Sequence, residues 1–429
     1  VFSFNIFASE LEKILTEIDI SGTIVTESAI TFDKMDSEKL EMILQPELNA
    51  NLFDNISFTG IFRIRADMND NLEPGKQAQS SISPLSRRIL ISENVDAELR
   101  EFYFDSFLND TAIRLGKQQV VWGQADGLKV LDVINPQSFR EFILDEFVDS
   151  RIPLWMINTE TSLGNDTQLQ ILWIPDTTYQ YLPVGGSYTF TTSRLIPQAP
   201  EGYDVVLNKE NRPKNLFNDS DIGVKLSSFY KGWDVTFNYL YHYKDSAVLY
   251  RSITANTVTI NPEYERTHLI GGTLSNAFGD YTLRSEFGYS TDNYYVTHNT
   301  SSINGIEKSE EASFVIGLDY SGLTDSFLSI QIFQSLLIDN VKSLSRSKVE
   351  NTITFLAERT FINETFKFET LLIHSMDDGD GVIRSKLKYE YLDNLNFWFG
   401  ANIFYGHSDG FYGQFNNRDN VNLGFEWGF

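Results

Sequence analysis

The last nine residues, Val421-Asn-Leu-Gly-Phe-Glu-Trp-Gly-Phe429, alternate between two kinds of side chain. The five residues at odd positions are apolar, and the four at even positions are small or polar. Because a β-strand sends alternate side chains to opposite faces, the segment predicts a strand with one wholly apolar face. That face would meet a core in a soluble sandwich. In an outer-membrane barrel it would meet lipid, and an aromatic C-terminus is typical of the closing strand.

The same alternation recurs from about residue 17 to the end, for example over 55–68, 233–241 and 281–289. Short turn-like connections such as 109–110 and 393–394 alternate with long ones. The long connections are expected near 27–38, 69–92, 123–152, 177–218, 245–262, 291–308 and 407–417. Short periplasmic turns and long outer loops are typical of bacterial barrels, and turns this tight require antiparallel pairing. We predict an all-β, antiparallel, up-and-down transmembrane barrel of about 18 strands, with 16 as the alternative. Both termini should lie in the periplasm. The expected strands are 17–26, 39–50, 55–68, 93–108, 111–121, 153–163, 167–175, 219–229, 232–243, 264–277, 280–290, 311–320, 325–336, 347–359, 363–375, 381–392, 395–406 and 419–429.

The composition agrees with a barrel in the bacterial outer membrane. The chain contains 33 Phe and 20 Tyr, which suit a lipid-facing band with aromatic girdles at both interfaces. It has no run of about 18 apolar residues, so a membrane-spanning helix is not expected. A soluble protein built from stacked sandwiches would show polar outer faces, whereas these faces carry Phe, Tyr, Trp, Leu and Ile.

The formal charge of -25 argues against a nucleic-acid partner, because such partners are bound through Lys and Arg. Acidic outer loops either keep the protein soluble before insertion or bind divalent cations near lipopolysaccharide. The stretch 377–380, Asp-Asp-Gly-Asp, could hold a structural calcium ion through oxygen ligands or be a polar turn. With no cysteine and no catalytic motif, we expect no cofactor, no other metal and no enzyme activity.

The N-terminal segment differs from the rest of the chain. Ser9 and Glu12 fit a capping box, and apolar residues that follow share one helical face. We expect residues 1–16 to form a helical segment, with the helix near 9–17, and residues 17–429 to form a single barrel. The helix could plug the lumen, lie at the periplasmic mouth or be a frayed terminus. The chain begins without a charged and apolar leader, as a mature exported protein would.

The long connection 122–152 is both apolar and charged. Its aliphatic residues, Leu128, Val130, Leu131, Val133 and Ile134, need burial. We therefore expect segment 123–152 to fold into the barrel, to pack on the wall and to narrow the pore with its polar residues.

Charged residues gather at the inward parity of several strands. A barrel of this size encloses water, so these charges can stay solvated. They could select solutes through a transverse field, or they could simply form pairs between strands. The pore-lining and constriction candidates are Arg63, Arg65, Arg114, Gln118, Trp122, Gln124, Asp126, Lys129, Asp132, Asn135, Arg140, Arg284, Glu286, Arg384, Lys386 and Lys388.

The block 114–136, RLGKQQVVWGQADGLKVLDVINP, together with 150–153, SRIP, resembles the DUF1302 family of Gram-negative outer-membrane proteins. More distantly it resembles the alginate-export porins, which share a strand ending in Arg-x-Gly-(Lys/Arg)-Gln before a Trp-Gly and an inward loop. The resemblance implies an outer-membrane channel of about 18 strands. It also implies an alternative, because some relatives look linked to the export of hydrophobic molecules.

These observations favour a porin-like channel for passive passage of a polar solute or oligomer, with the inward basic residues favouring an anionic one. The alternative is an outer-membrane part of an export or lipid-handling system that is not an open pore. The expected partners are outer-membrane lipid and lipopolysaccharide, the polar solute and, for the alternative, a periplasmic export partner. Phe425, Trp427 and Phe429 form the expected membrane-insertion signal that the barrel-assembly machinery would recognise.

Overall fold

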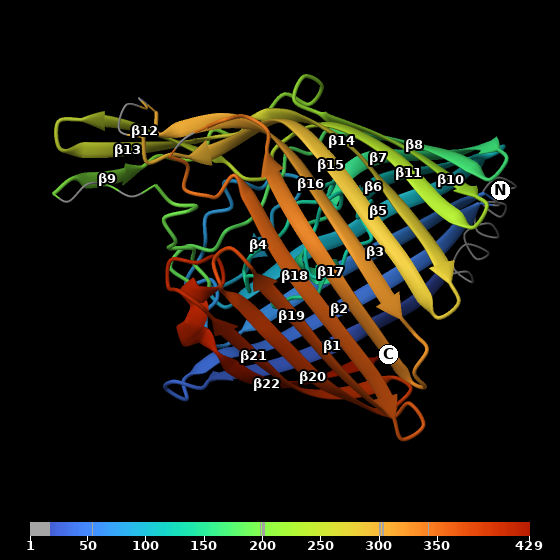
Figure 1. Cartoon of the computed structure of the whole chain (residues 1–429). Coiled ribbons are helices and arrows are strands. Elements are labelled where there is room, and N and C mark those ends of the chain that lie inside the picture. Colours follow the sequence, from blue (N-terminus) through green and yellow to red (C-terminus); the bar gives the residue numbers. More distant parts are fainter. Residues whose placement is uncertain are drawn as a thin grey trace, which may run out of the picture.

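The computed structural model describes residues 18–429, apart from residues 54, 198, 200, 201, 300, 301, 303 and 342. The helix predicted near 9–17 lies outside the described residues. Figure 1 shows a wide barrel of tilted strands, with short turns at one end and long connections at the other.

Eighteen strands form the barrel, as predicted. They are β1 (Ile18–Thr31), β2 (Ser37–Phe53), β3 (Ile56–Asp67), β5 (Val95–Leu108), β6 (Thr111–Gln118), β7 (Leu154–Gly164), β8 (Thr167–Ile174), β10 (Asp221–Tyr230), β11 (Trp233–Tyr243), β14 (Arg266–Phe278), β15 (Tyr281–Val296), β16 (Ile306–Tyr320), β17 (Ser326–Leu337), β18 (Val349–Phe361), β19 (Phe366–Ser375), β20 (Gly381–Leu392), β21 (Leu395–Tyr405) and β22 (Asn420–Gly428).

The barrel closes between its first and last strands. β1 and β22 pair antiparallel, from Thr23 opposite Gly428 to Thr31 opposite Asn420. Each of the remaining barrel strands pairs antiparallel with the barrel strand before it and the barrel strand after it in the sequence. Closure leaves the barrel without a free edge, so the strands' backbone hydrogen-bonding groups find partners within the sheet.

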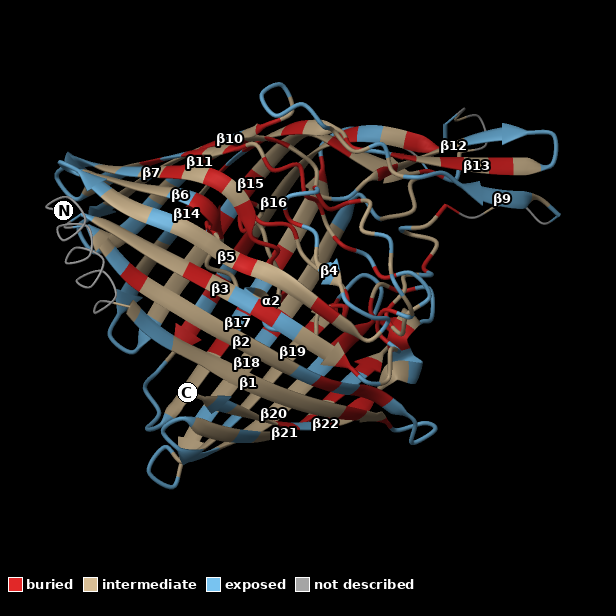
Figure 2. Cartoon of the chain, turned by 180° about the vertical axis from the view of Figure 1, so that it is seen from behind, coloured by how far each residue is buried: buried red, intermediate tan, exposed pale blue. Residues whose placement is uncertain are grey.

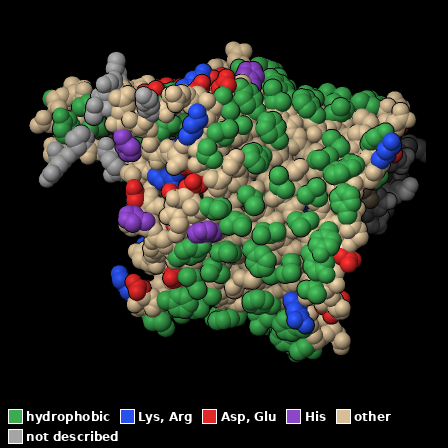
Figure 3. Space-filling model, viewed as in Figure 1, with side chains coloured by type: hydrophobic (Ala, Val, Ile, Leu, Met, Phe, Trp, Pro, Cys, Tyr) green, Lys and Arg blue, Asp and Glu red, His purple; other side chains and the backbone are tan. Residues whose placement is uncertain are grey.

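The outward parity is apolar around the barrel. Figure 3 shows hydrophobic side chains covering most of the barrel face in view, with few charges among them. Outward residues such as Phe237, Phe287, Ile316 and Phe399 are exposed in the isolated chain, as lipid-facing residues are. Leu423, Trp427 and Phe429 of the terminal segment lie on this face. The predicted outward parity is therefore confirmed, and the barrel is an outer-membrane barrel. No helix among the described residues is long and apolar enough to span a membrane.

The long connections carry structure that the alternation did not predict. β9 (Asp204–Leu207), β12 (Val248–Thr254) and β13 (Thr257–Glu263) form a separate three-stranded sheet that projects beyond the barrel (Figure 1). The prediction that 177–218 and 245–262 are loops is therefore wrong where these three strands lie. The shorter predicted loops 27–38 and 291–308 also contain strand, since β1 runs to Thr31 and β15 to Val296. These segments lie beyond or near the edge of the apolar belt, so lipid does not impose the pattern there.

Other small elements are β4 (Ile89–Leu90), which pairs with β5, the short helix α2 (Phe147–Ser150) and the 3-10 helix η1 (Gly413–Arg418). Buried residues of the long connections gather inside the barrel and near its outer end (Figure 2). One core cluster joins Val120, Trp122, Leu131 and Ile134 to residues of β7, β8, β11 and β14. Segment 119–153 therefore lies within the barrel and fills one side of it.

Candidate solute pathway inside the barrel

The inward segment 119–153 is tied together at its base by one side chain. Asn135 accepts a hydrogen bond from Val120 N at 2.7 Å and donates to Ile152 O at 3.0 Å. It also donates to Gln118 O at 3.3 Å. Because these contacts join the start, the middle and the end of the segment, Asn135 holds the whole excursion as one closed unit.

The tip of the segment is fixed to the wall of β15 and β17. The Glu286 carboxylate accepts hydrogen bonds from Gln124 N and Leu131 N. Arg284 donates to Gln124 O and contacts the Asp126 carboxylate at 2.5 Å. Gln331 donates to Asp126 Oδ2 at 2.8 Å. Four of the candidates, Gln124, Asp126, Arg284 and Glu286, therefore meet here, and their contacts position the loop.

Trp122 anchors the same segment on the nearby strands β8 and β10. Its indole nitrogen donates to Gln170 Oε1 at 2.7 Å. Its ring lies against Gly223 of β10, where a Cβ would come within 2.9 Å of Trp122 Cη2. A residue with a side chain at 223 would displace the ring. Nearby, Asp132 is paired with Lys129 at 3.0 Å and with Arg151 at 2.6 Å.

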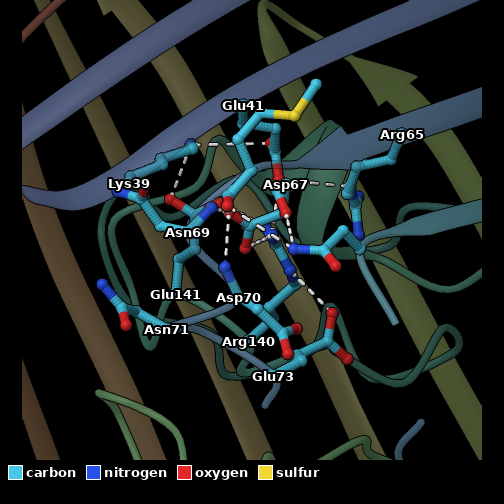
Figure 4. A network of polar contacts seen from close by, with 12 residues as sticks. Lys39, Glu41, Arg65, Asp67, Asn69, Asp70, Asn71, Glu73, Arg140 and Glu141 are labelled. Atoms are coloured by element: carbon cyan, nitrogen blue, oxygen red, sulfur yellow. Dashed lines mark hydrogen bonds and ion pairs between the residues drawn. The ribbon is translucent and has the colours of Figure 1, made fainter. Parts of the chain in front are cut away.

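Arg140 is the centre of a network of buried charges (Figure 4). Its guanidinium lies 2.5 Å from the Glu41 carboxylate and 3.0 Å from that of Asp67, on β2 and β3. It is also 2.7 Å from Glu73 and 2.8 Å from Glu141. Arg140 therefore joins the inward segment to the barrel wall and to the connection 68–94.

A second set of contacts holds residues 143–149 inside the barrel. Arg384 of β20 donates to Ile143 O at 3.0 Å and to Leu144 O at 2.7 Å. From β3, Arg63 pairs with Asp149. Residues 143–149 are therefore held between β3 and β20, beside the main wall of strands that joins them.

Three cavities lie along the β2, β3 and β5 side of the barrel. The main cavity, of about 420 Å³, lies in the lumen and is bounded by residues of β1–β3, β5, β19–β22 and the inward segment. Two smaller cavities, of about 20 and 30 Å³, lie beyond it. All three share Arg65, and the cavity of 20 Å³ reaches the exposed residues Ser92 and Glu93.

The series narrows sharply at Arg65 and Arg140. A water molecule needs roughly 10–15 Å³ of cavity volume, so each small cavity holds about one to three waters. In this conformation an organic solute would fit the main cavity and not the two smaller ones. The narrow part lies where the inward segment contacts the wall.

The main cavity has a mixed wall with ten carboxylates and seven cationic side chains. Most of the cations have close carboxylate partners. Lys39, for example, lies 2.8 Å from Glu141, and Arg65 lies 3.6 Å from Glu41. Lys386 has only a long contact of 3.9 Å with Glu146, and Lys388 makes no ion pair within 4 Å among the described residues. The least compensated positive charge therefore lies on β20.

Two loop carboxyls beside the narrow part respond to their surroundings in opposite directions. Burial raises the pKa of the Asp145 carboxyl to about 7, and the nearby Glu141 carboxylate adds to this effect. Burial acts the same way on Glu73, but Arg88 and Arg140 outweigh it and hold the pKa of Glu73 below its usual range. Asp145 is thus a cavity group that can change charge near neutral pH.

The structure separates the predicted site residues into two groups. Arg63, Arg65, Arg384, Lys386 and Lys388 line the main cavity, and Arg140 lines both small ones. The other candidates line none of the three. The inner loop residues among them are packed between segment and wall, and Arg114 pairs with Asp105 near the short-turn end. The buried ones are Gln118, Trp122, Asp132, Asn135 and Glu286.

The stretch 377–380 does not converge on one point. Asp377 accepts from Asn351 N, Asp378 pairs with Arg194, and Asp380 accepts from Tyr412 N and Gly413 N. No group of three or more His, Asp or Glu side chains in the described part of the chain is arranged to hold a metal ion. Calcium at the acidic loops stays an untested prediction.

Several residues at the narrow part were not singled out from the sequence. They are Lys39, Glu41, Glu73, Arg88, Arg100, Glu141, Asp145 and Asp149. Lys39 and Glu41 alternate with the outward Leu40 and Met42, so the inward parity of β2 carried a signal. The loop residues carried none, because their meeting depends on how the two long connections 68–94 and 119–153 fold.

The DUF1302 family model, described as a protein of unknown function, matches residues 67–362. The chain belongs to the DUF1302 family. The match includes the inward segment and its anchors on β15 and β17, so the predicted resemblance is confirmed. No curated protein matches this DUF1302 chain in sequence.

Solved outer-membrane proteins from Pseudomonas aeruginosa share the fold of this DUF1302 chain. OpdK with vanillate aligns with a TM-score of 0.52 and 10% identity, over 97% of this chain and 99% of that one. OccK2 (OpdF) in complex with glucuronate gives 0.52 and 9%, over 96% and 97%. OccK5 (OpdH) gives 0.51 and 11%, over 96% and 98%. At this identity the likeness concerns the fold.

Proposed function

We propose that this protein is a gated, porin-like channel through which a small polar solute passes passively. The observation that carries the proposal is the series of cavities from the main lumen to the outer rim, joined through Arg65 and interrupted where segment 119–153 contacts the wall. Loosening of that contact would open the route. The polar lining supports a hydrated solute, since a path for hydrophobic molecules would need apolar inward faces at this depth.

The solute we propose is anionic. The main cavity has more carboxylates than cations, but most cations are paired, and Lys386 and Lys388 on β20 are the least compensated. An anion can bind these two ammonium groups and displace only the long contact of Lys386 with Glu146. The carboxylates of the loop and of other strands would then repel the anion from other parts of the cavity and direct it to β20. Two of the aligned structures are described with carboxylates, vanillate and glucuronate, which agrees with this class.

The alternative is an export component that does not conduct by itself. The narrowness of the passage at Arg140 favours it, because only a few water molecules fit there. Such a component would need a periplasmic partner to move the inward segment.

Two partners are expected whether the protein is a channel or an export component. Outer-membrane lipid surrounds the apolar belt. We further propose that the barrel-assembly machinery recognises the terminal strand through Phe425, Trp427 and Phe429, of which Trp427 and Phe429 are exposed on the outward face.

Conductance in a planar bilayer tests the proposal. The purified chain should give ohmic single-channel steps, and deletion of residues 126–145 should raise the step size several-fold. Heat-modifiable migration in gels would show that the deletion variant still folds. If both proteins are folded and both are silent, the channel proposal fails and the export alternative stands.

A further inference from the structure

Trp398 is the one aromatic side chain of the described barrel wall that lines the main cavity. It lies on β21, opposite Gly424 of β22 in the register. A Cβ at position 424 would come within 2.3 Å of Trp398 Cζ2, so the glycine makes room for the indole ring against the wall. An aromatic ring in a water-filled lumen is not needed for packing in the way that the buried Trp122 is.

Two lysines flank this ring on the neighbouring strand. Lys388 lies opposite Trp398 in the β20–β21 register, and Lys386 Nζ is 5.2 Å from the centre of the Trp398 ring. These are the two cations of the cavity with the weakest carboxylate pairing. The wall therefore combines available positive charge with an aromatic face.

Polar groups complete the same wall. Asn422 lies on β22, and Glu426 lies two residues beyond Gly424 on the inward parity; both line the cavity. Glu27 of β1 stands opposite Gly424, and its carboxylate is paired with Lys39 at 3.5 Å. Hydroxyl groups of a solute could bind these amide and carboxylate oxygens while its negative charge faces β20.

We propose that Trp398, Lys386 and Lys388 form a binding subsite for a carboxylate attached to a six-membered ring. The carboxylate would pair with the two ammonium groups, and the ring would pack on the indole beside the Lys386 ammonium, which lies over the Trp398 ring. Lysines alone would accept any small anion, whereas the neighbouring aromatic face favours anions that carry a ring. Both aromatic acids and sugar acids have this chemistry, since aromatic rings and the C–H faces of sugars pack on indole.

This inference rests on the proposed channel function, because it names the solute class of that cavity. Calorimetry on the whole chain in detergent tests binding without requiring conduction. The probes are benzoate for the aromatic source, glucuronate for the sugar source, and acetate for a carboxylate without a ring. We expect benzoate, glucuronate or both to bind at least about tenfold more tightly than acetate. Equal binding of all three, or binding of none, overturns the subsite.

Variants locate the binding. The double variant Lys386→Gln with Lys388→Gln should weaken binding of the ring acids about tenfold or more, the effect of losing charged hydrogen bonds. Trp398→Leu should remove the preference for ring acids over acetate while leaving the binding of acetate. Two control variants should change neither the binding of ring acids nor the binding of acetate. They are Lys225→Gln, at an inward position of β10 outside the cavity, and Phe399→Leu, at an outward position next to Trp398.

The outcomes separate this inference from the channel proposal. Conducting wild-type protein whose ring-acid binding survives the lysine and tryptophan substitutions would overturn the subsite and leave the channel intact. Silent wild-type protein that binds ring acids through these residues would overturn the channel and support the subsite.

Discussion

The guanidinium of Arg140 lies 2.5 Å from the carboxylate of Glu41, although one residue belongs to the inward segment and the other to strand β2. Arg140 is almost completely buried, and three further carboxylates contact it. A buried cation with four anionic neighbours cannot be removed without leaving their charges unbalanced. This contact therefore links the position of the segment to the electrostatics of the wall.

Arg140→Met should release the inward segment. Loss of one partner from a buried ion pair costs about 3–5 kcal/mol, and here that cost falls on the closed arrangement. We expect single-channel conductance to rise several-fold in planar bilayers. The matched control is Arg114→Met, because Arg114 forms a partly exposed pair with Asp105 outside the three cavities and should leave conductance unchanged. Unaltered conductance in folded Arg140→Met would show that this network does not hold the passage closed.

Conductance should depend on pH through Asp145. Because its pKa is raised to about 7 in the closed arrangement, that arrangement binds a proton more tightly than a freely solvated carboxyl would. The proton therefore stabilises closure at acidic pH, and this stabilisation is lost as the pH rises through about 7. Mean conductance should increase between pH 5 and pH 8.

The asparagine variant checks that assignment. Asp145→Asn should make conductance independent of pH in this window. Asp245→Asn is the control, since burial also raises the pKa of Asp245 to about 7 but Asp245 lines none of the three cavities. If the pH response persists in Asp145→Asn and disappears in Asp245→Asn, the conductance depends on the charge of Asp245 and not on that of Asp145.

An arginine on the outward face should destabilise the barrel. Phe287→Arg places a charge in the lipid near mid-height, at a cost of about 2–4 kcal/mol. Glu369→Arg places the same charge in the lumen and should cost little, since Glu369 lines the main cavity. Urea unfolding in lipid vesicles measures the free energy of unfolding of both variants. Equal losses of stability would contradict the assignment of the two faces.

Charge reversal on β20 should change ion selectivity. Lys386→Glu combined with Lys388→Glu removes the least compensated positive charges of the cavity and adds two carboxylates. Reversal potentials in a salt gradient should shift toward cations. Charges at the outer mouth are screened beyond about 8–10 Å at physiological salt, so neutralising acidic outer loops should shift selectivity less. A larger shift from the loops would place the selective region at the mouth.

The alternation of side chains was enough to predict the barrel and its strands. Along β21, outward Phe397, Phe399 and Ile403 meet lipid while inward Trp398 and Asn402 meet water, so the environment imposes a period of two. The same reasoning placed Arg284 and Glu286 inward. It did not predict their role, because Glu286 receives hydrogen bonds from loop backbone 155 or more residues away in sequence.

The alternation of side chains did not predict the projecting sheet or the Arg140 network. Strands β12 and β13 stand outside the membrane, where no lipid forces one face to be apolar. Arg140, Glu73 and Glu41 come together from three separate parts of the chain, and no local pattern marks such a meeting. Only the aliphatic content of segment 123–152 indicated that it would need burial.

The pairing of β1 with β22 brings the two ends of the chain together at the wall of the main cavity. About two thirds of the residues that line this cavity belong to β1–β3 and β19–β22 and lie outside the stretch 67–362 that matches the family. The inward segment, in contrast, lies within it. In the proposed channel, the middle of the chain would thus carry the gate, and the first and last strands would carry the wall that faces the solute. Exchange of the terminal strands between relatives would transplant solute preference and leave the gate in place.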